Sequence, residues 1–440
     1  MTPYDEANPL SIEAYAKRLE NKTLRDLLGS DIEQTYSGKG KLGQLLEEKY
    51  FQYYPNSDAR ADFYQAGVEL KTSPLKIING KLVSKERLVL NIIDFANEPK
   101  QTFETSGFWL KNRLLLLMFY LHDVTKIEID LIFKICRLWN FPEEDLKIIK
   151  DDWQKIVGKI RAGLAHELSE GDTLYLGACT KGATAASSYR SQPYSIEPAK
   201  QRAYSLKSKY LNFIIDDSLK NQSELAVKSE SDYQDGQTFE ELIAERFRKF
   251  YGKSDLEIMS ELSIPSTNAK SKFYLIAKAI LGVNSKYIAE FEKANVELKT
   301  IRLERNGNLK ESMSFKQIQY TEIVNECWEN SYWLETLTKR FFFVVFQKDR
   351  NGKLRLKKVM FWAMPVSDLE IARKFWEDTR AKILANEFDD FIKASDNRVC
   401  HVRPKGRDSD DLMATATGRM VKKKSYWLNA KYIKKIISDN

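Results

Sequence analysis

The chain has 440 residues, of which 43% are hydrophobic, and its 70 basic and 62 acidic side chains give a net charge of +8. This length is enough for two or three domains with ordinary cores, and the positive charge is compatible with a polyanionic partner. The four cysteines lack C-x-x-C spacing and there are only three histidines, which argues against a disulfide framework and a zinc site and predicts a cytoplasmic protein. No apolar run is longer than eight residues, which argues against a transmembrane helix and predicts a protein without membrane association.

An amphipathic helix is predicted near residues 42–50. Leu42, Leu45, Leu46 and Tyr50 follow spacings of three and four residues, which place their side chains on one helix face. Glu47 lies within this segment, immediately upstream of the most informative motif of the chain. We therefore expect a helix that buries one face and carries a carboxylate next to that motif.

The motif is D-x6-E-x-K, and it follows a turn expected at residues 56–58. Glu69 and Lys71 share one face of a predicted strand, and Asp62 lies just before it. Phosphodiester hydrolysis needs a hard divalent cation with carboxylate ligands and a group that activates water. Asp62 and Glu69 can supply ligands, with Glu47 as a further candidate. Lys71 can orient the water and stabilise charge on phosphorus. The ordinary alternative is an exposed hairpin with solvated charges.

Two further elements complete a domain of mixed α/β class. Residues 114–121 form an apolar run of strand length, and residues 151–160 have helical periodicity. We predict a mixed sheet flanked by helices.

The motif segment occurs twice. Residues 61–72 (ADFYQAGVELKT) recur as residues 289–300 (AEFEKANVELKT), with eight of twelve residues identical. Further pairs match in the same order, namely 39–42 with 270–273, 113–116 with 340–343, 180–182 with 404–406, and 204–210 with 426–432. Such a repeat indicates a duplicated domain. We predict a catalytic domain at residues 1–220, a polar linker at 221–237 and a second domain at 238–440.

The second copy keeps the Glu-x-Lys pair but changes the other acidic positions. Lys278 stands opposite Glu47, and Glu290 stands opposite Asp62. An ammonium at the helix position opposes a divalent cation and competes for the remaining carboxylates. We therefore predict that the second domain does not cut DNA.

Basic residues are nevertheless abundant in the second copy. Residues 418–440 carry six lysines and one arginine against one acid, interleaved with Tyr426, Trp427 and Tyr432. This composition suits phosphate contacts, and a solvated helix face is the alternative. We expect binding without cutting.

Several segments of the first half carry a family resemblance. They are residues 39–47 (KGKLGQLLE), 67–72 (GVELKT), 84–93 (SKERLVLNII), 165–171 (AHELSEG), 179–183 (CTKGA) and 200–208 (KQRAYSLKS). These segments resemble the mismatch-repair nicking endonuclease MutH and its GATC-cutting restriction relatives, and the two-domain length is similar to that of the larger type II enzymes of this group. The resemblance implies the PD-(D/E)XK nuclease fold in both tandem domains, Mg2+ as the cofactor and duplex DNA containing GATC as the substrate.

The resemblance also implies roles for single residues. Asp62, Glu69 and Lys71 correspond to the catalytic set, with Glu47 beside them as a further metal ligand. Lys111 or Arg113 corresponds to a further basic active-site residue. The loop at Lys181 corresponds to the base-reading loop, where the family has an Arg-Pro-Lys run that this domain lacks and that residues 403–405 restore. The full set of basic residues expected at DNA is Lys39, Lys111, Arg113, Lys181, Arg202 and Lys207 in the first domain, and Arg403, Lys405 and Lys431 in the second.

We therefore predict a type II restriction endonuclease that cuts both strands at GATC with its first domain, while its second domain binds a second GATC site as an effector. A cognate methyltransferase would protect host DNA without binding this chain, and self-association on DNA is compatible with this prediction. The alternatives are a MutH-type nicking endonuclease of mismatch repair and a non-catalytic DNA-binding regulator. The two-domain length disfavours the first alternative, and the intact D-x6-E-x-K motif disfavours the second.

Overall fold

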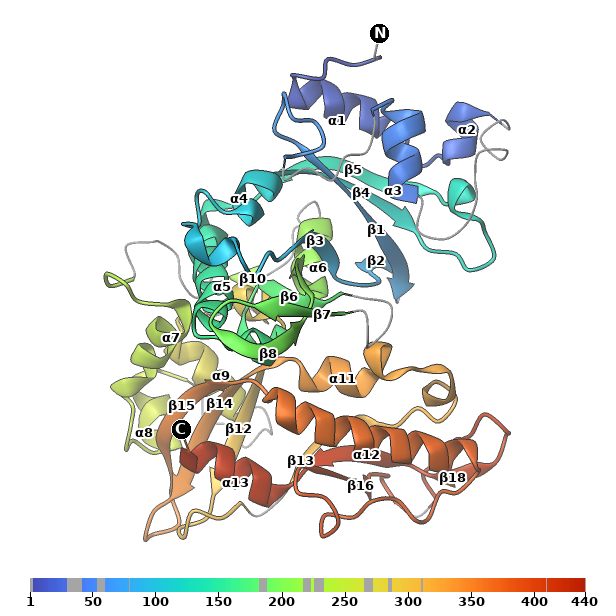
Figure 1. Cartoon of the computed structure of the whole chain (residues 1–440). Coiled ribbons are helices and arrows are strands. Elements are labelled where there is room, and N and C mark those ends of the chain that lie inside the picture. Colours follow the sequence, from blue (N-terminus) through green and yellow to red (C-terminus); the bar gives the residue numbers. More distant parts are fainter. Residues whose placement is uncertain are drawn as a thin grey trace. The chain divides into compact units, whose positions relative to one another are not determined.

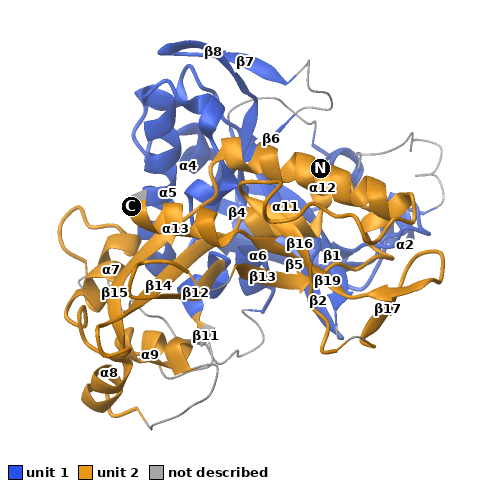
Figure 2. Cartoon of the chain, turned by 90° about the horizontal axis from the view of Figure 1, so that it is seen from below, with its two compact units in different colours: residues 1–223, 227–232, 289–295 blue, residues 224–226, 233–288, 296–440 orange. Residues whose placement is uncertain are grey.

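The computed structural model (Figure 1) describes residues 3–29, 42–53, 60–78, 80–181, 188–216, 223–224, 233–264, 272–283, 287–309, 312–408 and 410–439. The chain divides into two compact units (Figure 2). Unit 1 comprises residues 1–223, 227–232 and 289–295, and unit 2 comprises residues 224–226, 233–288 and 296–440. Most of the expected linker and the turn at 56–58 lie outside the described residues, so the domain boundaries given above stay a prediction.

Unit 1 is built on a four-stranded mixed sheet in the order β2-β1-β4-β5. β1 (Glu69–Ile78) runs parallel to β4 (Leu114–Leu121), while β2 (Lys81–Ser84) and β5 (Phe133–Asn140) are antiparallel to their neighbours. The apolar run forms the central strand β4, as expected, because a central strand is covered on both faces. A second sheet has the order β3-β9-β6, with strands β3 (Leu88–Ile92), β9 (Arg202–Leu206) and β6 (Leu176–Thr180). A separate two-stranded hairpin consists of β7 (Tyr189–Gln192) and β8 (Ser195–Lys200).

Helices cover the sheets of unit 1. α1 (Pro9–Lys17) packs on β5, and α3 (Leu42–Leu45) packs on β1. The predicted apolar face is buried, but the helix turns into a π-helix, η2 (Leu46–Tyr50), at the segment that carries Glu47. π-helical turns are frequent at functional sites. The other helices are α2 (Leu24–Leu28), η3 (Glu98–Lys100), α4 (Gly107–Asn112), η4 (Glu128–Asp130), α5 (Glu143–Arg161), η5 (Ala165–Glu167), η6 (Glu170–Asp172) and α6 (Ser208–Asp216).

Unit 2 repeats the plan of unit 1. β12 (Val296–Leu303) is parallel to β14 (Arg340–Lys348), which is antiparallel to β15 (Leu354–Trp362). The second sheet has the order β13-β19-β16, from β13 (Met313–Gln317), β19 (Lys424–Leu428) and β16 (Cys400–Pro404). α12 (Val366–Leu384) packs on β16 as α5 packs on β6. The remaining elements are β10 (Ser223–Glu224), α7 (Phe239–Arg248), α8 (Asp255–Glu261), α9 (Lys272–Ile280), β11 (Tyr287–Ile288), η8 (Ile323–Asn325), η9 (Trp328–Asn330), α11 (Tyr332–Leu337), β17 (Leu412–Ala414), β18 (Met420–Lys422) and α13 (Ala430–Asp439), and α10 (Ala289–Lys293) belongs to unit 1.

A buried tyrosine–aspartate hydrogen bond occurs in both units and supports the duplication. The Tyr210 hydroxyl donates to Asp145 at 2.8 Å in unit 1, and the Tyr432 hydroxyl donates to Asp368 at 2.6 Å in unit 2. In each case the tyrosine lies on the helix that follows the central strand of the second sheet, and the aspartate lies in the first turn of the longest helix of the unit. A tandem duplication of one mixed α/β domain explains both pairs.

Strand register corrects one part of the sequence alignment. Leu115 pairs with Glu69, and Phe341 pairs with Glu297. Leu115 and Phe341 are therefore equivalent in the two copies, and so are Leu114 and Arg340, one residue earlier. The match of residues 113–116 with residues 340–343 is thus shifted by one residue. The segment between α4 and β4 in unit 1 and the segment between α11 and β14 in unit 2 differ in length, which matching the two sequences did not detect.

The aromatic residues near the C-terminus belong to the core. Tyr426 and Tyr432 are buried, in contrast to the expectation of a phosphate-binding surface on which lysines alternate with aromatic residues. Among the described residues, no helix combines the length and apolar character that crossing a bilayer requires.

Candidate active site

The turn before β1 brings two carboxylates together. The backbone N–H of Asp62 donates to Glu69 Oε2 at 3.1 Å, and the backbone N–H of Leu70 donates to Asp62 Oδ2 at 2.9 Å. An antiparallel bridge between Phe63 and Val68 closes the turn. Each carboxylate is therefore held by the backbone next to the other, which fixes their separation before any ligand binds.

Two ammonium groups approach the same glutamate. Lys71 Nζ lies 2.5 Å from Glu69 Oε1, and Lys111 Nζ, from the last turn of α4, lies 3.6 Å from that oxygen. Glu69 is 1% exposed, which rules out the solvated hairpin. Arg113 instead lies beside Gly67, where its Nη2 is 3.5 Å from the place of a Cβ. Of the two basic candidates, the geometry favours Lys111.

Burial and like charge shape the acids of the site. Burial raises the pKa of Glu69, and the Lys71 ammonium opposes this shift. Burial, followed by the negative charge of Asp62, raises the pKa of Glu47 to about 7. Carboxylates that share a partly desolvated site destabilise one another when ionised. A cation at this place would relieve that repulsion.

The donor set fits magnesium by its chemistry. Among the described residues, no group of three His, Cys, Asp or Glu side chains already has a metal-binding arrangement. The two Glu69 oxygens are occupied by the Asp62 backbone and by Lys71. Asp62, Glu69 and Glu47 nevertheless offer only hard oxygen donors, which Mg2+ prefers. These residues could hold the ion if Glu69 exchanged its ion pair with Lys71 for the metal.

Tyr53 is a polar group of this site that the sequence did not point out. Its hydroxyl is buried and has no hydrogen-bond partner among the described residues, and its backbone N–H donates to the Glu47 carbonyl at 2.9 Å. Its ring lies edge-on to Phe63, with 5.0 Å between centroids. Burial, followed by the charges of Asp62 and Glu47, raises the pKa of this hydroxyl. No spacing in the sequence separates Tyr53 from the core aromatics around it.

The two candidate base-reading lysines occupy matching places. Lys181 directly follows β6, and its backbone N–H donates to Gln201. Lys405 directly follows β16, and its backbone N–H donates to Lys423. Both lysines are half-buried at the end of an edge strand of the second sheet. Residues 182–187 lie outside the described residues.

Other basic candidates have structural roles in unit 1. Arg202 is buried and donates to Ala178 O at 3.2 Å and to Thr180 Oγ1 at 2.9 Å, so it joins β9 to β6. Lys207 donates to the Thr173 carbonyl. The hydrogen bonds of the buried Arg202 give it a structural role in place of the expected DNA contact. Lys207 is only half-buried, so its expected contact with DNA stays a prediction. Lys39 lies outside the described residues.

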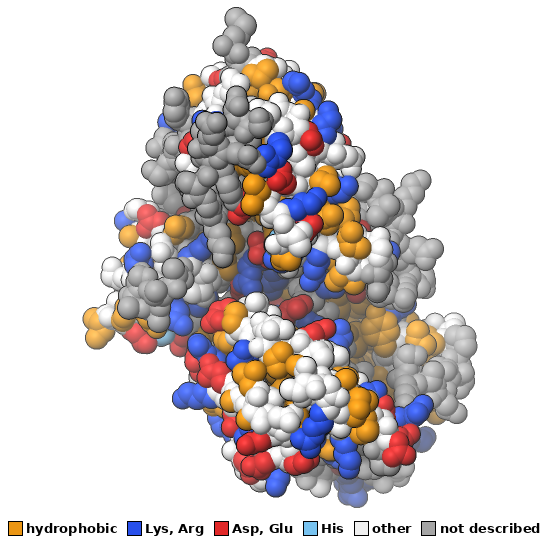
Figure 3. Space-filling view, turned by 90° about the vertical axis from the view of Figure 1, so that its right-hand side faces the viewer, with side chains coloured by type: hydrophobic (Ala, Val, Ile, Leu, Met, Phe, Trp, Pro, Cys, Tyr) orange, Lys and Arg blue, Asp and Glu red, His pale blue; other side chains and the backbone are white. Residues whose placement is uncertain are grey.

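The basic residues of unit 2 divide in the same way. Arg403 is exposed and lies over the Trp427 ring, and Lys431 is exposed on α13. Lys424, one of the six lysines of residues 418–440, is buried and donates to the Phe388 carbonyl, so it is not available for the phosphate contacts that the composition of this segment suggested. On the face shown in Figure 3, basic, acidic and apolar side chains are interspersed. The net positive charge alone therefore does not mark a DNA surface.

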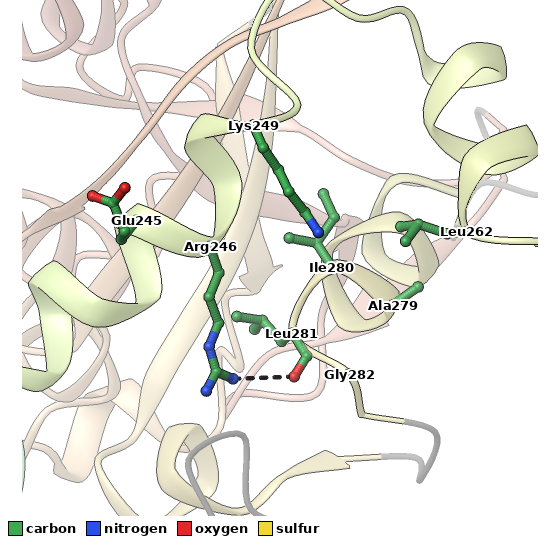
Figure 4. Close-up of a pocket in the computed structure, with 8 residues that line it drawn as sticks. All are labelled: Glu245, Arg246, Lys249, Leu262, Ala279, Ile280, Leu281 and Gly282. Carbon is green, nitrogen blue, oxygen red and sulfur yellow. Dashed lines mark hydrogen bonds between the residues drawn. The ribbon is translucent and has the colours of Figure 1, made fainter. Parts of the chain in front are cut away.

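The second copy of the motif has a different charge pattern. Glu297 accepts from Lys299 at 2.6 Å and from Lys339 at 3.1 Å. Burial alone would raise the pKa of Glu297, but Lys299 and then Lys339 lower it. The counterpart of Glu47 is Lys278, and α10 with Glu290 belongs to unit 1. A pocket between α7 and α9 (Figure 4), where Arg246 donates to the Leu281 carbonyl at 3.4 Å, contains none of the motif residues.

Comparison with known proteins gives two kinds of match. The profile of the family described as DNA mismatch repair enzyme MutH matches residues 51–152 and, separately, residues 281–374. The type II restriction enzyme Sau3AI of Staphylococcus aureus is 34% identical over 488 aligned residues, covering 96% of this chain and 97% of that protein. The DNA mismatch repair protein MutH of Vibrio parahaemolyticus is 24% identical, and that of Vibrio campbellii 23%, each over 44% of this chain and 91% of the relative.

Proposed function

The chain belongs to the family of MutH-like nucleases, with a type II restriction enzyme as a relative along nearly its whole length, and from this premise we propose that it hydrolyses both strands of duplex DNA at GATC with Mg2+. It is a site-specific deoxyribonuclease of tandem MutH-like domains. The observation that carries the proposal is the pair of the half-buried Asp62 and the buried Glu69, held by the backbone and flanked by Lys71 and Lys111.

The protein's own groups have distinct tasks in hydrolysis. Bound magnesium would supply Lewis acidity and lower the pKa of a water molecule. Asp62 and Glu69, with Glu47, would hold it. The Lys71 ammonium orients the attacking water and stabilises negative charge on the phosphoryl oxygens, as a fixed cation in a partly desolvated site does. Lys111, on the same side of Glu69, adds a second positive charge there.

The two units divide cutting and binding in this proposal. Unit 1 cuts, and Lys181 contacts DNA beside the recognised bases. The second copy of the motif has Lys278 in place of Glu47 and Glu290 in place of Asp62, while Arg403 and Lys405 are kept, so unit 2 binds a second GATC duplex and stimulates unit 1 as an effector. The protein acts in the cytoplasm, where a cognate methyltransferase protects host GATC sites.

Plasmid cleavage tests this function against its alternatives. Incubation of the purified protein with a GATC-containing plasmid and magnesium should give linear fragments. Nicked circles would support a MutH-type nicking enzyme, and intact plasmid with a gel shift would support a non-catalytic DNA-binding regulator.

Substitution of the catalytic set is the first prediction. Asp62→Ala, Glu69→Ala and Lys71→Ala should each lower the cleavage rate by about a hundredfold or more, because the first two remove a carboxylate that would hold magnesium and the third removes a positive charge that acts on the reacting phosphate. A gel shift in EDTA should show that DNA binding persists. A variant that cuts at a near wild-type rate would exclude its residue from the catalytic set.

A further inference from the structure

Three lysines of unit 2 gather around one carboxylate and one aromatic residue. Lys299 and Lys339 both contact Glu297, at 2.6 and 3.1 Å. Lys299 also lies over the Phe315 ring, 5.3 Å from its centroid. Lys405, which is distant in sequence, donates to the Phe315 carbonyl at 2.6 Å. Burial, followed by the charge of Lys299, lowers the pKa of Lys405, which agrees with their proximity. We call Lys299, Lys339 and Lys405 the unit 2 lysine cluster.

The charge of this cluster is opposite to that of the site in unit 1. Three ammonium groups and the Glu297 carboxylate leave two net positive charges. In unit 1, three acids face Lys71 and Lys111, which leaves one net negative charge when all are ionised. A positive site repels a divalent cation and attracts an anion. These charges favour a cation at the site of unit 1 and an anion at the cluster of unit 2.

The side chains of the cluster are partly exposed to solvent. The side chains of Lys299 and Lys339 are 26% and 24% exposed, and Glu297 is 29% exposed. Glu297 is now the anion that these ammonium groups hold, so a phosphate would share them with it. Arg403 and Lys405 lie over the same Trp427 ring, at 5.3 and 5.8 Å, which extends the basic surface from the cluster.

We propose that the unit 2 lysine cluster binds a backbone phosphate of duplex DNA without a metal ion. This inference rests on the proposed function, in which unit 2 holds a second duplex. The phosphodiester takes the place that the scissile phosphate has in unit 1, but the lysines neutralise it in place of magnesium, so it is held and not cut. Ammonium groups neutralise phosphate as point charges and make the binding dependent on salt.

The test uses the full-length chain with Asp62→Ala, which prevents cleavage, and a short duplex with one GATC in EDTA. Calorimetric titration should give two duplexes per chain. Lys299→Gln and Lys405→Gln should each weaken the second binding event about tenfold and lower the slope of log affinity against log salt by about one, while the first event is unchanged. Lys348→Gln, which removes a lysine paired with Glu304 in the same unit, is the matched control and should change neither event.

Glu297→Gln separates a phosphate site from a metal site. Loss of the competing carboxylate should strengthen the second binding event in EDTA if the cluster holds phosphate. Weaker binding that needs magnesium would overturn the proposal. If the lysine variants and the Lys348→Gln control all bind two duplexes, and bind the second with the same affinity, the phosphate site is overturned but the effector function is not. One duplex per chain in every variant would overturn the effector function itself.

Discussion

Glu69 and Glu297 occupy the same register position on two parallel strand pairs, yet their surroundings give them different chemistry. Burial raises the pKa of Glu69, so its charge is costly and a cation nearby is favourable. Two ammonium groups lower the pKa of Glu297, so its charge is already neutralised. Conservation of one residue type therefore does not conserve its role, because the neighbouring residues decide what the carboxylate can bind.

Glu47 should make the metal-free protein sensitive to pH. Its pKa in the folded chain, about 7, is above the ordinary value of 4.5, so folding favours the protonated form. Stability is therefore lost as the pH rises from the ordinary value through about 7. In EDTA, the melting temperature of the wild type should fall across this range more than that of Glu47→Gln. Parallel curves for the two proteins would contradict the raised pKa.

Lys111 and Arg113 should differ in their effect on cleavage. Lys111→Ala removes an ammonium 3.6 Å from Glu69 and should lower the rate of the chemical step about ten- to a hundredfold, less than a primary catalytic group. Arg113→Ala removes a group that lies beside Gly67 and should have a smaller effect. Single-turnover cleavage at saturating enzyme measures both. Equal losses would show that Arg113 also acts on the phosphate.

The turn that enters β1 needs a left-handed residue in both copies. Gly67 has φ +65°, and Asn295, its counterpart in the repeat, has φ +52°. Glycine adopts this conformation freely, and asparagine tolerates it better than other residues do. The turn carries Asp62 towards Glu69, so the backbone conformation of one residue positions the catalytic pair.

Substitutions at Gly67 should reveal this requirement. Gly67→Asn should keep most of the activity, since the second copy uses asparagine in the same conformation. Gly67→Val should cost roughly 1–2 kcal/mol of stability and also lower cleavage, because a β-branched residue is strained at positive φ. Gly80→Val, at φ +75° with no atom within 4 Å of its Cβ, is the matched control: it should lose similar stability and keep activity. If both valine variants cut equally well, the turn does not position Asp62.

The elements were predictable from sequence where hydrophobic pattern decides them. Residues 114–121 form β4, and the apolar face at residues 42–50 is buried as expected. The π-turn at Glu47 was missed, because spacings of three and four residues do not distinguish an α-helix from one containing a single wider turn. The helix that was expected at residues 151–160 begins earlier, at Glu143, because its charged first turn hides the periodicity.

Side-chain direction was less predictable than the elements. Pattern alone left Lys111 and Arg113 equivalent, and the junction between α4 and β4 decides which of them reaches Glu69. Arg202 was expected to contact phosphate because sequence cannot show that its donors bind a carbonyl and a hydroxyl group of its own unit. Proximity of Lys405 to Lys299 depends on a long-range sheet contact that no local spacing encodes.

Duplication followed by divergence of charge explains how one chain could use two copies of a nuclease domain. Both units have the parallel strand pair with an antiparallel neighbour, a three-stranded second sheet, the long helix and the buried tyrosine–aspartate pair. The acidic positions differ, because Lys278 stands in place of Glu47 and Glu290 in place of Asp62. In the proposed function, unit 2 therefore binds DNA without magnesium. A second copy that only binds is useful if its occupancy changes the activity of the first.

The proposed effector role predicts that two GATC sites on one DNA molecule are cut faster than one. A plasmid with two sites can occupy both units at once, because the second site is present at a high local concentration. Stimulation then requires that DNA in unit 2 favours an arrangement of the chain in which unit 1 is active, and coupling free energies of this kind are typically about 1–3 kcal/mol, or roughly 5- to 150-fold. We expect a rate difference in this range between plasmids with two sites and with one. Adding a short GATC duplex in trans should raise the rate on the one-site plasmid.

Arg403→Ala combined with Lys405→Ala should remove that difference while leaving the slow cleavage of the one-site plasmid unchanged, since both residues belong to unit 2. The matched control is Lys348→Gln, which should keep the full stimulation. Equal cutting of both plasmids by the wild type, with the double variant unchanged on each, would refute the effector role. Loss of cleavage of one strand in Glu297→Ala alone would instead show that unit 2 cuts DNA, because a carboxylate that only competes with phosphate for the lysines cannot be needed for hydrolysis of a single strand.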